Sequence, residues 1–482
     1  MLFNTFQFVA FLLVVFSVDA LLPRKCRTPF LLAASLYFYM CWMPQYVVLI
    51  LIAIAVNFVA ALAIDGSSSP NRRRVILAGA LIPTFGMLFV YKYLDFVVST
   101  VNNLLHRCGS QFEAPLIHLI LPAGISFFTF QTASYTIDVF RRQMQAERDP
   151  IRFATFISFF PQLVAGPIER AEHLLPQIRD DRQVTLENIT VGCRWILLGL
   201  FKKMVVADTC SVLVHTIFDM PTSYPGPILI LGSIFFAFQV YGDFSGYSDI
   251  AVGVARLFDV RLMQNFRQPY MARSVAEYWQ RWHISLTSWF RDYIYLPLGG
   301  NRVRPLRWAM NVSAVFILSG AWHGANWTFI AWGALHSIYF LAQHYWTPIY
   351  RRITRSLSLD LVPFLLPLVE WLTMWALVLF GYFFFRARTM DRAVYMATHV
   401  FDFRGFHPES LLQIGVPKME IGFLFIWMLL LLGIDYVMAF QPRWAMKLWG
   451  YRPVRWFVYM TGFWIIALFG VFENVEFIYF QF

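Results

Sequence analysis

Long apolar stretches separated by short basic clusters dominate the pattern of this sequence. Residues 29–64 and 308–350 contain no Asp, Glu, Lys or Arg. Each stretch is long enough for two membrane-spanning helices, because one span needs as few as about 17 predominantly apolar residues. Pro44 lies inside the first stretch and predicts a turn there. The pattern therefore predicts an all-α protein that crosses a membrane repeatedly.

Similar stretches follow along the chain, and together they predict about eleven membrane-spanning helices. These further stretches lie near residues 2–18, 75–98, 115–139, 187–218, 226–255, 362–385, 420–440 and 456–478. Lys202 and Lys203 interrupt the stretch at 187–218. Residues 153–164 are apolar but too short to span, which indicates a re-entrant or interfacial segment. Because no soluble segment and no repeat stands out, the pattern predicts a single domain over residues 1–482.

One segment, Asp259–Arg307, has a different pattern, with eight Arg and no Lys. Ser274 and Glu277 have the spacing of a capping box, which begins a helix. At about 100° per residue, the positions that follow place His283 on an apolar face. The other residues of this face are Val275, Trp279, Trp282, Leu286, Phe290 and Tyr293. We expect one amphipathic helix that ends near Pro297 and lies at the cytoplasmic interface or packs against the other helices.

Composition agrees with a membrane protein, since 59% of the residues are hydrophobic and only 14% are charged. A soluble domain has about 25% charged residues. The net charge of +11 comes from basic clusters between apolar stretches, so the positive-inside rule explains it better than nucleic-acid binding does. The sequence contains no zinc-finger spacing, P-loop or dinucleotide fingerprint, and we predict neither a metal site nor a bound cofactor.

The charges near the N-terminus predict the orientation of the chain. No basic residue precedes the first apolar stretch, whereas Arg24, Lys25 and Arg27 follow it. This order is not that of a cleaved signal peptide. We therefore expect the N-terminus outside the cytoplasm and the loop at 24–27 inside.

Two histidines are the first candidates for chemistry. His323 lies inside the uncharged stretch, where a straight helix starting at residue 308 would carry it about 24 Å into the membrane. An ionisable group at this depth is costly and is a functional candidate, although a neutral histidine that bridges two helices is the alternative. His283 is either a buried core residue or a second catalytic group that binds the donor or orients the acceptor. The small neighbours of His323 are Gly320, Ala321, Gly324 and Ala325.

Charged residues add further candidates. Asp243 and Asp249 are the only charges in 221–254. A pairing with Arg256 or Arg273 would give them a structural role, and a role at a functional site is the alternative. A subset of the arginines in the basic segment is a candidate for binding the phosphates of a nucleotide-bearing donor. These arginines are Arg261, Arg267, Arg273, Arg281, Arg291, Arg302, Arg304 and Arg307. These residues alone do not decide between a transporter and an enzyme.

Several motifs, in order along nearly the whole chain, resemble those of the membrane-bound O-acyltransferase family. They are LPAGISFFTFQ (121–131), FPQLVAGPI (160–168), YGDFSGYSD (241–249), RWHISLTSWFRDY (281–293), LPLGGNR (296–302), WHGANW (322–327) and FIYFQF (477–482). The branch that they resemble most is that of the bacterial alginate O-acetyltransferases, and the teichoic acid D-alanyl transferases are more distant.

The resemblance implies a ring of helices with a thin centre, where a cytoplasmic donor tunnel meets an outward-facing pocket. It implies that His323 is the catalytic histidine and His283 the second histidine of the family. The motifs also contain the candidate substrate-binding residues Asp243, Asp249, Trp322, Asn326 and Arg281.

The resulting prediction is an O-acyltransferase of the bacterial cytoplasmic membrane. It would move an acyl group, with acetyl as the expected one, from cytoplasmic acyl-CoA toward hydroxyls of an exported polysaccharide such as alginate or a cellulose-like polymer. The resemblance implies acyl-CoA as co-substrate, membrane lipid as surroundings and a periplasmic partner similar to SGNH hydrolases. The alternatives are a transporter or flippase of polysaccharide or lipid intermediates, and an acyltransferase that acts on lipid or protein.

Cys26 tests the predicted orientation, because it lies in the basic loop that we place inside. A membrane-impermeant thiol reagent should leave Cys26 unlabelled in intact cells and should label it after permeabilisation. The measurement uses a variant in which the other cysteines, at 41, 108, 193 and 210, are replaced by Ser. Labelling in intact cells would invert the topology.

Overall fold

The described secondary structure is entirely helical, as the sequence predicts. The computed structural model describes residues 1–164, 166–178, 181–358, 362, 364–407, 410, 414, 417–473 and 477–478. Two compact units make up the chain. Unit 1 comprises residues 1–196, 247–263 and 479–482, and unit 2 comprises residues 197–246 and 264–478. The boundary falls within α10 (Leu186–Leu200) and α12 (Gly226–Leu257). The single-domain interpretation stays a prediction.

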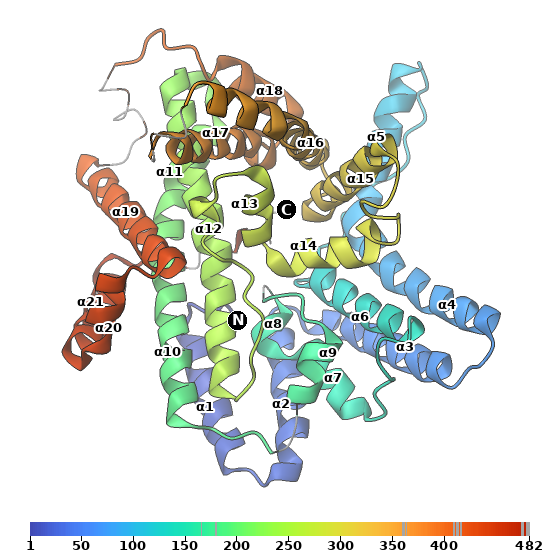
Figure 1. Ribbon diagram of the computed structural model, residues 1–482. Helices are drawn as coiled ribbons and strands as arrows, with labels where there is room; N and C mark the ends of the chain where they lie inside the picture. The colour runs from blue at the N-terminus through green and yellow to red at the C-terminus, as the bar shows by residue number, and fades with distance from the viewer. Residues whose placement is uncertain are drawn as a thin grey trace. The chain divides into compact units, whose positions relative to one another are not determined.

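Unit 1 contains the N-terminal helices (Figure 1). They are α1 (Phe6–Leu21), α2 (Arg24–Met40), η1 (Pro44–Tyr46), α3 (Val47–Asp65), α4 (Pro70–Leu88), η2 (Phe89–Tyr93), α5 (Leu94–Arg107), α6 (Ile125–Phe140), α7 (Pro150–Ser158), α8 (Phe160–Leu163), α9 (Ala171–Leu174) and η3 (Leu175–Gln177). The predicted turn at Pro44 is confirmed. The apolar stretch 153–164, which the sequence predicts to be too short to span, lies in the short helices α7 and α8.

Buried polar side chains join three helices of unit 1. Asn57 on α3 donates from Nδ2 to Thr84 Oγ1 on α4 at 2.9 Å. Its Oδ1 accepts from Thr136 Oγ1 on α6 at 2.7 Å. Such bonds are favourable between membrane helices because a polar group left alone in hydrocarbon finds no water to replace its partner.

Unit 2 contains the C-terminal helices and the two candidate histidines. Its elements after α10 are η4 (Phe201–Ala207), α11 (Asp208–Asp219), η5 (Pro221–Ser223), α12 up to residue 246, η6 (Pro269–Met271), α13 (Val275–Arg281), α14 (Ile284–Phe290), η7 (Arg291–Tyr295), α15 (Pro305–His323), α16 (Trp327–Ser356), α17 (Leu365–Arg386), α18 (Met390–His399), α19 (Lys418–Phe440), α20 (Arg443–Gly450) and α21 (Arg452–Phe469). The interruption predicted at Lys202 and Lys203 is a π-helix, η4.

The number of predicted spans is not confirmed. Within the described residues, five helical stretches are long and apolar enough to cross a membrane. They are Pro44–Asp65, Pro70–Arg107, Gly226–Leu257, Leu365–Arg386 and Lys418–Phe440. The predicted span 115–139 is helical only from Ile125, and the helix α21 within the predicted span 456–478 ends at Phe469. The hairpin predicted within 308–346 is present as α15 and α16, although neither helix is among the five.

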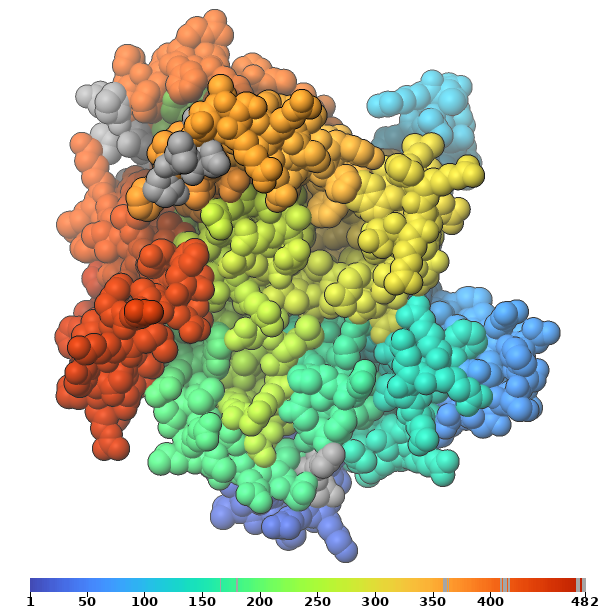
Figure 2. Space-filling model, viewed as in Figure 1, coloured from blue at the N-terminus to red at the C-terminus, as the bar shows by residue number. Residues whose placement is uncertain are grey.

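Large aromatic side chains are exposed on α20 and α21. They are Trp444, Trp456, Phe457, Phe463 and Trp464, each more than half exposed. In Figure 2 these helices, coloured red, lie on the face in view. An exposed apolar surface of this kind is typical of a membrane-facing helix, because lipid takes the place of water around it.

Helices α15 and α16 pack side by side with their backbones in close contact (Figure 1). A Cβ atom added at Gly320 on α15 would overlap the carbonyl oxygen of Phe329, and one added at Gly333 on α16 would overlap that of Phe316. Small residues allow this approach, which the sequence predicts from the small neighbours of His323. The contact fixes the end of α15, where His323 lies.

Gly320→Ala tests this contact. We expect it to lower the free energy of unfolding by about 1–3 kcal/mol, because the backbone oxygen that it meets cannot move aside. The measurement is thermal unfolding of the purified protein in detergent. The matched control is Gly433→Ala on α19, where an added Cβ meets nothing within 4 Å. The control should be neutral or stabilising, by up to about 1 kcal/mol. Equal melting temperatures for the two variants would contradict the proposed close approach.

Candidate active site

The turn between α15 and α16 positions His323. His323 is the last residue of α15, and its side chain is buried. Asn326 caps α16, because its Oδ1 accepts from the backbone N–H of Thr328 at 3.1 Å. Its Nδ2 donates to the carbonyl of Arg388 at 3.0 Å, which joins the turn to the segment that follows α17. Asn326 therefore has a structural role here, and its predicted role in substrate binding stays a prediction.

A break in the helix positions His283. The single amphipathic helix predicted from Ser274 is wrong, because the chain forms α13 and α14 with Trp282 and His283 between them. His283 has φ 43° and ψ 54°, a left-handed conformation that few residues other than Gly adopt. The capping interaction at the start is confirmed, since Ser274 Oγ accepts from the N–H of Glu277 at 3.1 Å. The burial of His283 is also confirmed.

Asn265 stabilises this break from a distant part of the chain. Its backbone carbonyl accepts from the N–H of Ile284 at 2.9 Å. Its side-chain Oδ1 accepts from the N–H of Ser285 at 3.2 Å and from Ser285 Oγ at 2.9 Å. The same Oδ1 lies 3.1 Å from Nδ1 of His283. Asn265 is itself buried, so these bonds are protected from water.

The contacts of Asn265 decide which nitrogen of His283 carries the proton. A backbone N–H can only donate, so the atom that faces Ser285 N is the amide oxygen. Nδ1 of His283 must then donate to that oxygen, which leaves the lone pair on Nε2. Burial lowers the pKa of His283 to about 3, so the ring is neutral at physiological pH.

The structure brings the two histidines of unit 2 together, although they are 40 positions apart in the sequence. Their ring centroids are 6.4 Å apart, and both side chains are buried. Trp322 lies beside both rings, at 5.8 Å from His283 and 5.2 Å from His323. Trp332 and Phe385 also lie beside His323, with ring centroids at 5.3 and 5.2 Å from that of His323. An imidazole in such apolar surroundings can accept a proton from a substrate away from bulk water.

Asp243 has a structural partner that the sequence does not indicate. Its Oδ1 lies 2.6 Å from Lys203 Nζ, and Lys203 also contacts Asp208 Oδ1 at 2.7 Å. Oδ2 of Asp243 accepts from the N–H of Ile478 at 2.7 Å. The alternative in which Asp243 pairs with Arg256 or Arg273 is not what the structure shows, because Lys203 is the cation beside it.

The remaining charged candidates are Asp249 and Arg281. Asp249 is buried and belongs to unit 1. Arg281 pairs with Glu277 at 2.7 Å on the outer side of α13. Both assignments to substrate binding stay predictions. No group of three or more His, Cys, Asp or Glu in the described part of the chain is arranged to hold a metal ion.

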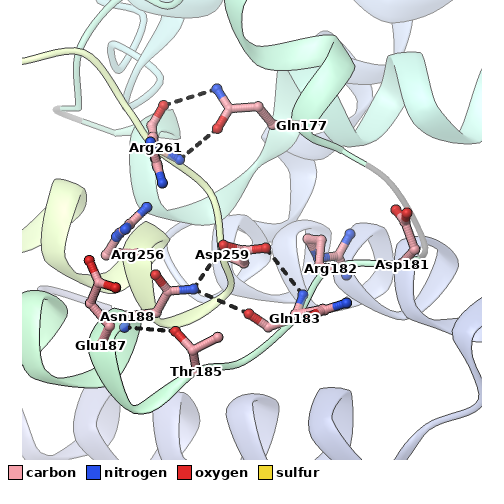
Figure 3. Close-up of a pocket in the computed structure, with 10 residues that line it drawn as sticks. All are labelled: Gln177, Asp181, Arg182, Gln183, Thr185, Glu187, Asn188, Arg256, Asp259 and Arg261. Carbon is pink, nitrogen blue, oxygen red and sulfur yellow. Dashed lines mark hydrogen bonds between the residues drawn. The ribbon is translucent and has the colours of Figure 1, made fainter.

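Unit 1 contains a separate polar cavity of about 500 Å³ (Figure 3). Its lining residues are Gln177, Asp181, Arg182, Gln183, Thr185, Glu187, Asn188, Arg256, Asp259 and Arg261. Asn188 Nδ2 donates to Asp259 Oδ1 at 2.8 Å, and Gln177 Oε1 accepts from the N–H of Arg261 at 2.8 Å. Charges of both signs line this cavity, so it is not a simple anion site.

Comparison with known proteins identifies the family. A sequence profile described as MBOAT, membrane-bound O-acyltransferase family, matches residues 142–377. The protein named "Probable alginate O-acetylase AlgI" of Pseudomonas aeruginosa is 34% identical over 421 residues, which cover 87% of this chain and 78% of that protein. The chain belongs to the membrane-bound O-acyltransferase family.

Two further relatives of this membrane-bound O-acyltransferase have other names. The peptidoglycan O-acetyltransferase of Helicobacter pylori is 36% identical over 427 residues, with 82% of this chain and 78% of that protein covered. The teichoic acid D-alanyltransferase of Bacillus subtilis is 26% identical over 279 residues, with 55% of this chain and 66% of that protein covered. The protein is thus an acyltransferase enzyme, and family membership favours this over the transporter alternative.

Several residues of this O-acyltransferase site were not among the sequence candidates. Asn265, Trp332 and Phe385 contact the two histidines from other elements, and His336 lies one helical turn after Trp332. The spacing of Trp332 and His336 on one face of α16 was available in the sequence as a signal. For Asn265 and Phe385, nothing in the local pattern indicates a contact with a histidine.

Asn265→Ala tests the support of His283. We expect acyltransferase activity to fall at least tenfold, because the variant lacks the side-chain oxygen that fixes the ring of His283. The same oxygen accepts the hydrogen bonds of Ser285 at the start of α14, and these are lost as well. The measurement is activity per amount of folded protein, with the melting temperature determined in parallel.

Asn311→Ala is the matched control for this variant. Asn311 is also a buried Asn of unit 2, and its Nδ2 donates to the carbonyls of Leu298 and Gly300 at 3.2 Å. We expect a similar loss of stability and near-normal turnover. Equal turnover in both variants would remove the assigned role of Asn265.

Proposed function

We propose that this acyltransferase moves an acyl group, with acetyl as the first candidate, from acyl-CoA to hydroxyl groups of an extracytoplasmic polysaccharide. The observation that carries the proposal is the buried pair His283 and His323, with ring centroids 6.4 Å apart. A family of O-acyltransferases needs a base for the hydroxyl, and these imidazoles are surrounded by aromatic rings that exclude water.

The proposed roles of the two histidines differ. His323 removes the proton of the incoming hydroxyl, whose oxygen then attacks the thioester carbonyl carbon. The carbon–sulfur bond breaks, and the departing thiolate takes up the proton. We assign His283 to positioning the donor, because Asn265 holds its ring in a fixed orientation. The lowered pKa of His283 makes its imidazole a weak base, which suits a role in hydrogen bonding more than one in accepting a proton.

Exposed arginines support the proposal of an anionic donor. Arg302, Arg304 and Arg307 follow η7 and are exposed in unit 2. This stretch, coloured yellow, lies on the face in view in Figure 2. Guanidinium groups match the geometry of phosphate oxygens, and CoA carries several phosphate groups. We therefore propose that CoA is held at the arginine-rich segment on the cytoplasmic side, with its thioester arm reaching toward His323.

The wider arrangement is also part of the proposal. It comprises about eleven spans in a ring with a thin centre, a bacterial inner-membrane location and an extracytoplasmic N-terminus. In this arrangement CoA itself never crosses the bilayer. A periplasmic protein similar to SGNH hydrolases would complete transfer to the polymer.

The names of the relatives narrow the acceptor. The relatives are named for alginate, peptidoglycan and teichoic acid, which are all polymers outside the cytoplasm. We propose an alginate-like exopolysaccharide as the first acceptor. The identity of 36% to the Helicobacter pylori protein favours peptidoglycan as the second. Acetylation assays with each purified polymer, in the presence and absence of the partner, distinguish them.

Substitution of each histidine tests the division of roles. His323→Ala should lower turnover by about 10²–10⁴, which is the typical contribution of a general base. His283→Ala should also lower activity strongly, but part of it should return at high acyl-CoA concentration, because the donor is held less well. The measurement is transfer of labelled acetyl to polymer over an acetyl-CoA titration.

His344→Ala serves as the control for these variants, since this exposed histidine lies on α16 away from the pair. It should transfer at the normal rate. Near-normal turnover of the His323 variant would remove the catalytic assignment. An equal loss in both variants at all donor concentrations would remove the division of roles and leave the family assignment intact.

A further inference from the structure

Three buried nitrogen atoms near His323 have no hydrogen-bond partner in the described part of the chain. They are Nε1 of Trp279, Nε1 of Trp332 and Nδ1 of His336, which we name the indole–imidazole cluster. The three rings contact one another. The centroid distances are 5.7 Å between Trp279 and Trp332, 4.8 Å between Trp332 and His336, and 5.2 Å between Trp279 and His336. The exposed fraction is 8% for Trp279, 3% for Trp332 and 1% for His336.

Unpartnered polar atoms of this kind require an explanation. The great majority of buried polar groups in folded proteins have a hydrogen-bond partner, and leaving one without a partner lowers stability. Here three of them occur in one cluster. An indole N–H can only donate a hydrogen bond, so a missing partner must supply acceptor atoms. A ligand that carries oxygen acceptors would meet this requirement.

The cluster lies directly beside the predicted catalytic histidine. The ring of Trp332 is 5.3 Å from that of His323, and His336 follows one turn later on α16. On α17, the missing side chain of Gly381 leaves room near both. A Cβ there would lie 3.0 Å from His336 Nε2 and 3.6 Å from Trp332 Nε1. Gly381 therefore lets α17 pack closely against Nε1 of Trp332 and against Nε2 of His336, the other nitrogen of that ring.

We propose that the indole–imidazole cluster donates hydrogen bonds to the carbonyl oxygen of the acyl donor's thioester. This proposal rests on the function proposed above. A thioester carbonyl offers lone pairs and no donor, which matches the indole N–H groups. When the hydroxyl oxygen bonds to the carbonyl carbon, the carbonyl oxygen gains negative charge before the carbon–sulfur bond breaks. Fixed N–H groups in a buried site stabilise such a charge more than they stabilise the ground state.

Trp332→Phe tests the proposal, because it keeps an aromatic ring and removes the N–H. We expect kcat/KM with acetyl-CoA to fall about tenfold to a hundredfold, mostly in kcat. We expect binding of acetyl-CoA to weaken and binding of CoA without its acetyl group to stay unchanged, as measured by calorimetry. A role in packing alone would weaken both equally.

Gly381→Ala provides a second, independent variant, since it fills the space beside His336 and Trp332 without removing a ring. It should lower kcat/KM about tenfold with a melting temperature close to that of the unaltered protein. The control is Trp346→Phe, a half-exposed Trp farther along α16, which should leave both kinetic constants unchanged.

The outcomes separate this proposal from the proposed function. If the variants bind acetyl-CoA and CoA equally more weakly, or if kcat/KM is unchanged in both variants, the proposed role of the cluster is overturned. The unaltered protein would still transfer the acyl group in that case. If the unaltered protein neither binds nor uses acetyl-CoA, the proposed function itself fails.

Discussion

The close approach of α15 and α16 is the contact on which the candidate active site depends. Gly320 and Gly333 let the two backbones touch, and this holds the end of α15 against the first turns of α16. His323 stands at that end, and Trp332 faces it from the neighbouring helix, with His336 against Trp332 one turn farther along. A bulkier residue at either glycine would separate the catalytic candidate from the rings that surround it. The close packing of the two backbones at these glycines thus determines where the side chains of neighbouring residues lie.

The sequence predicts the parts of this site that depend on local patterns. The uncharged stretch with small residues predicts the hairpin, and the capping interaction at Ser274 is confirmed. The burial of His283 follows from helical periodicity even though the helix is broken there. One left-handed residue hardly changes the pattern of apolar positions, so the periodicity conceals the break.

The pattern of residues along the chain does not indicate contacts between distant segments. Asn265 precedes His283 by 18 positions in a stretch without regular structure, and its partners depend on the folded path of the chain. For Asp243 the sequence leaves an arginine partner and a functional role open, whereas the structure shows that Lys203 is the cation that reaches it. Apolar length alone does not establish the number of spans, because only five helical stretches in the described part of the chain are both long and apolar enough to cross a membrane. A buried polar network depends on three-dimensional proximity that a linear pattern does not contain.

The π-helix η4 has a consequence for how this chain tolerates length changes. A π-helical turn holds one more residue than an α-helical turn, and here the wide turn carries Lys203 between two carboxylates. Deleting a single residue within 201–207 would convert the turn to ordinary α-helix and rotate α10 by about 100° relative to α11. The ammonium group would then leave its carboxylates buried without a counter-ion. We therefore expect this segment to tolerate the substitution of a residue more easily than the deletion of one.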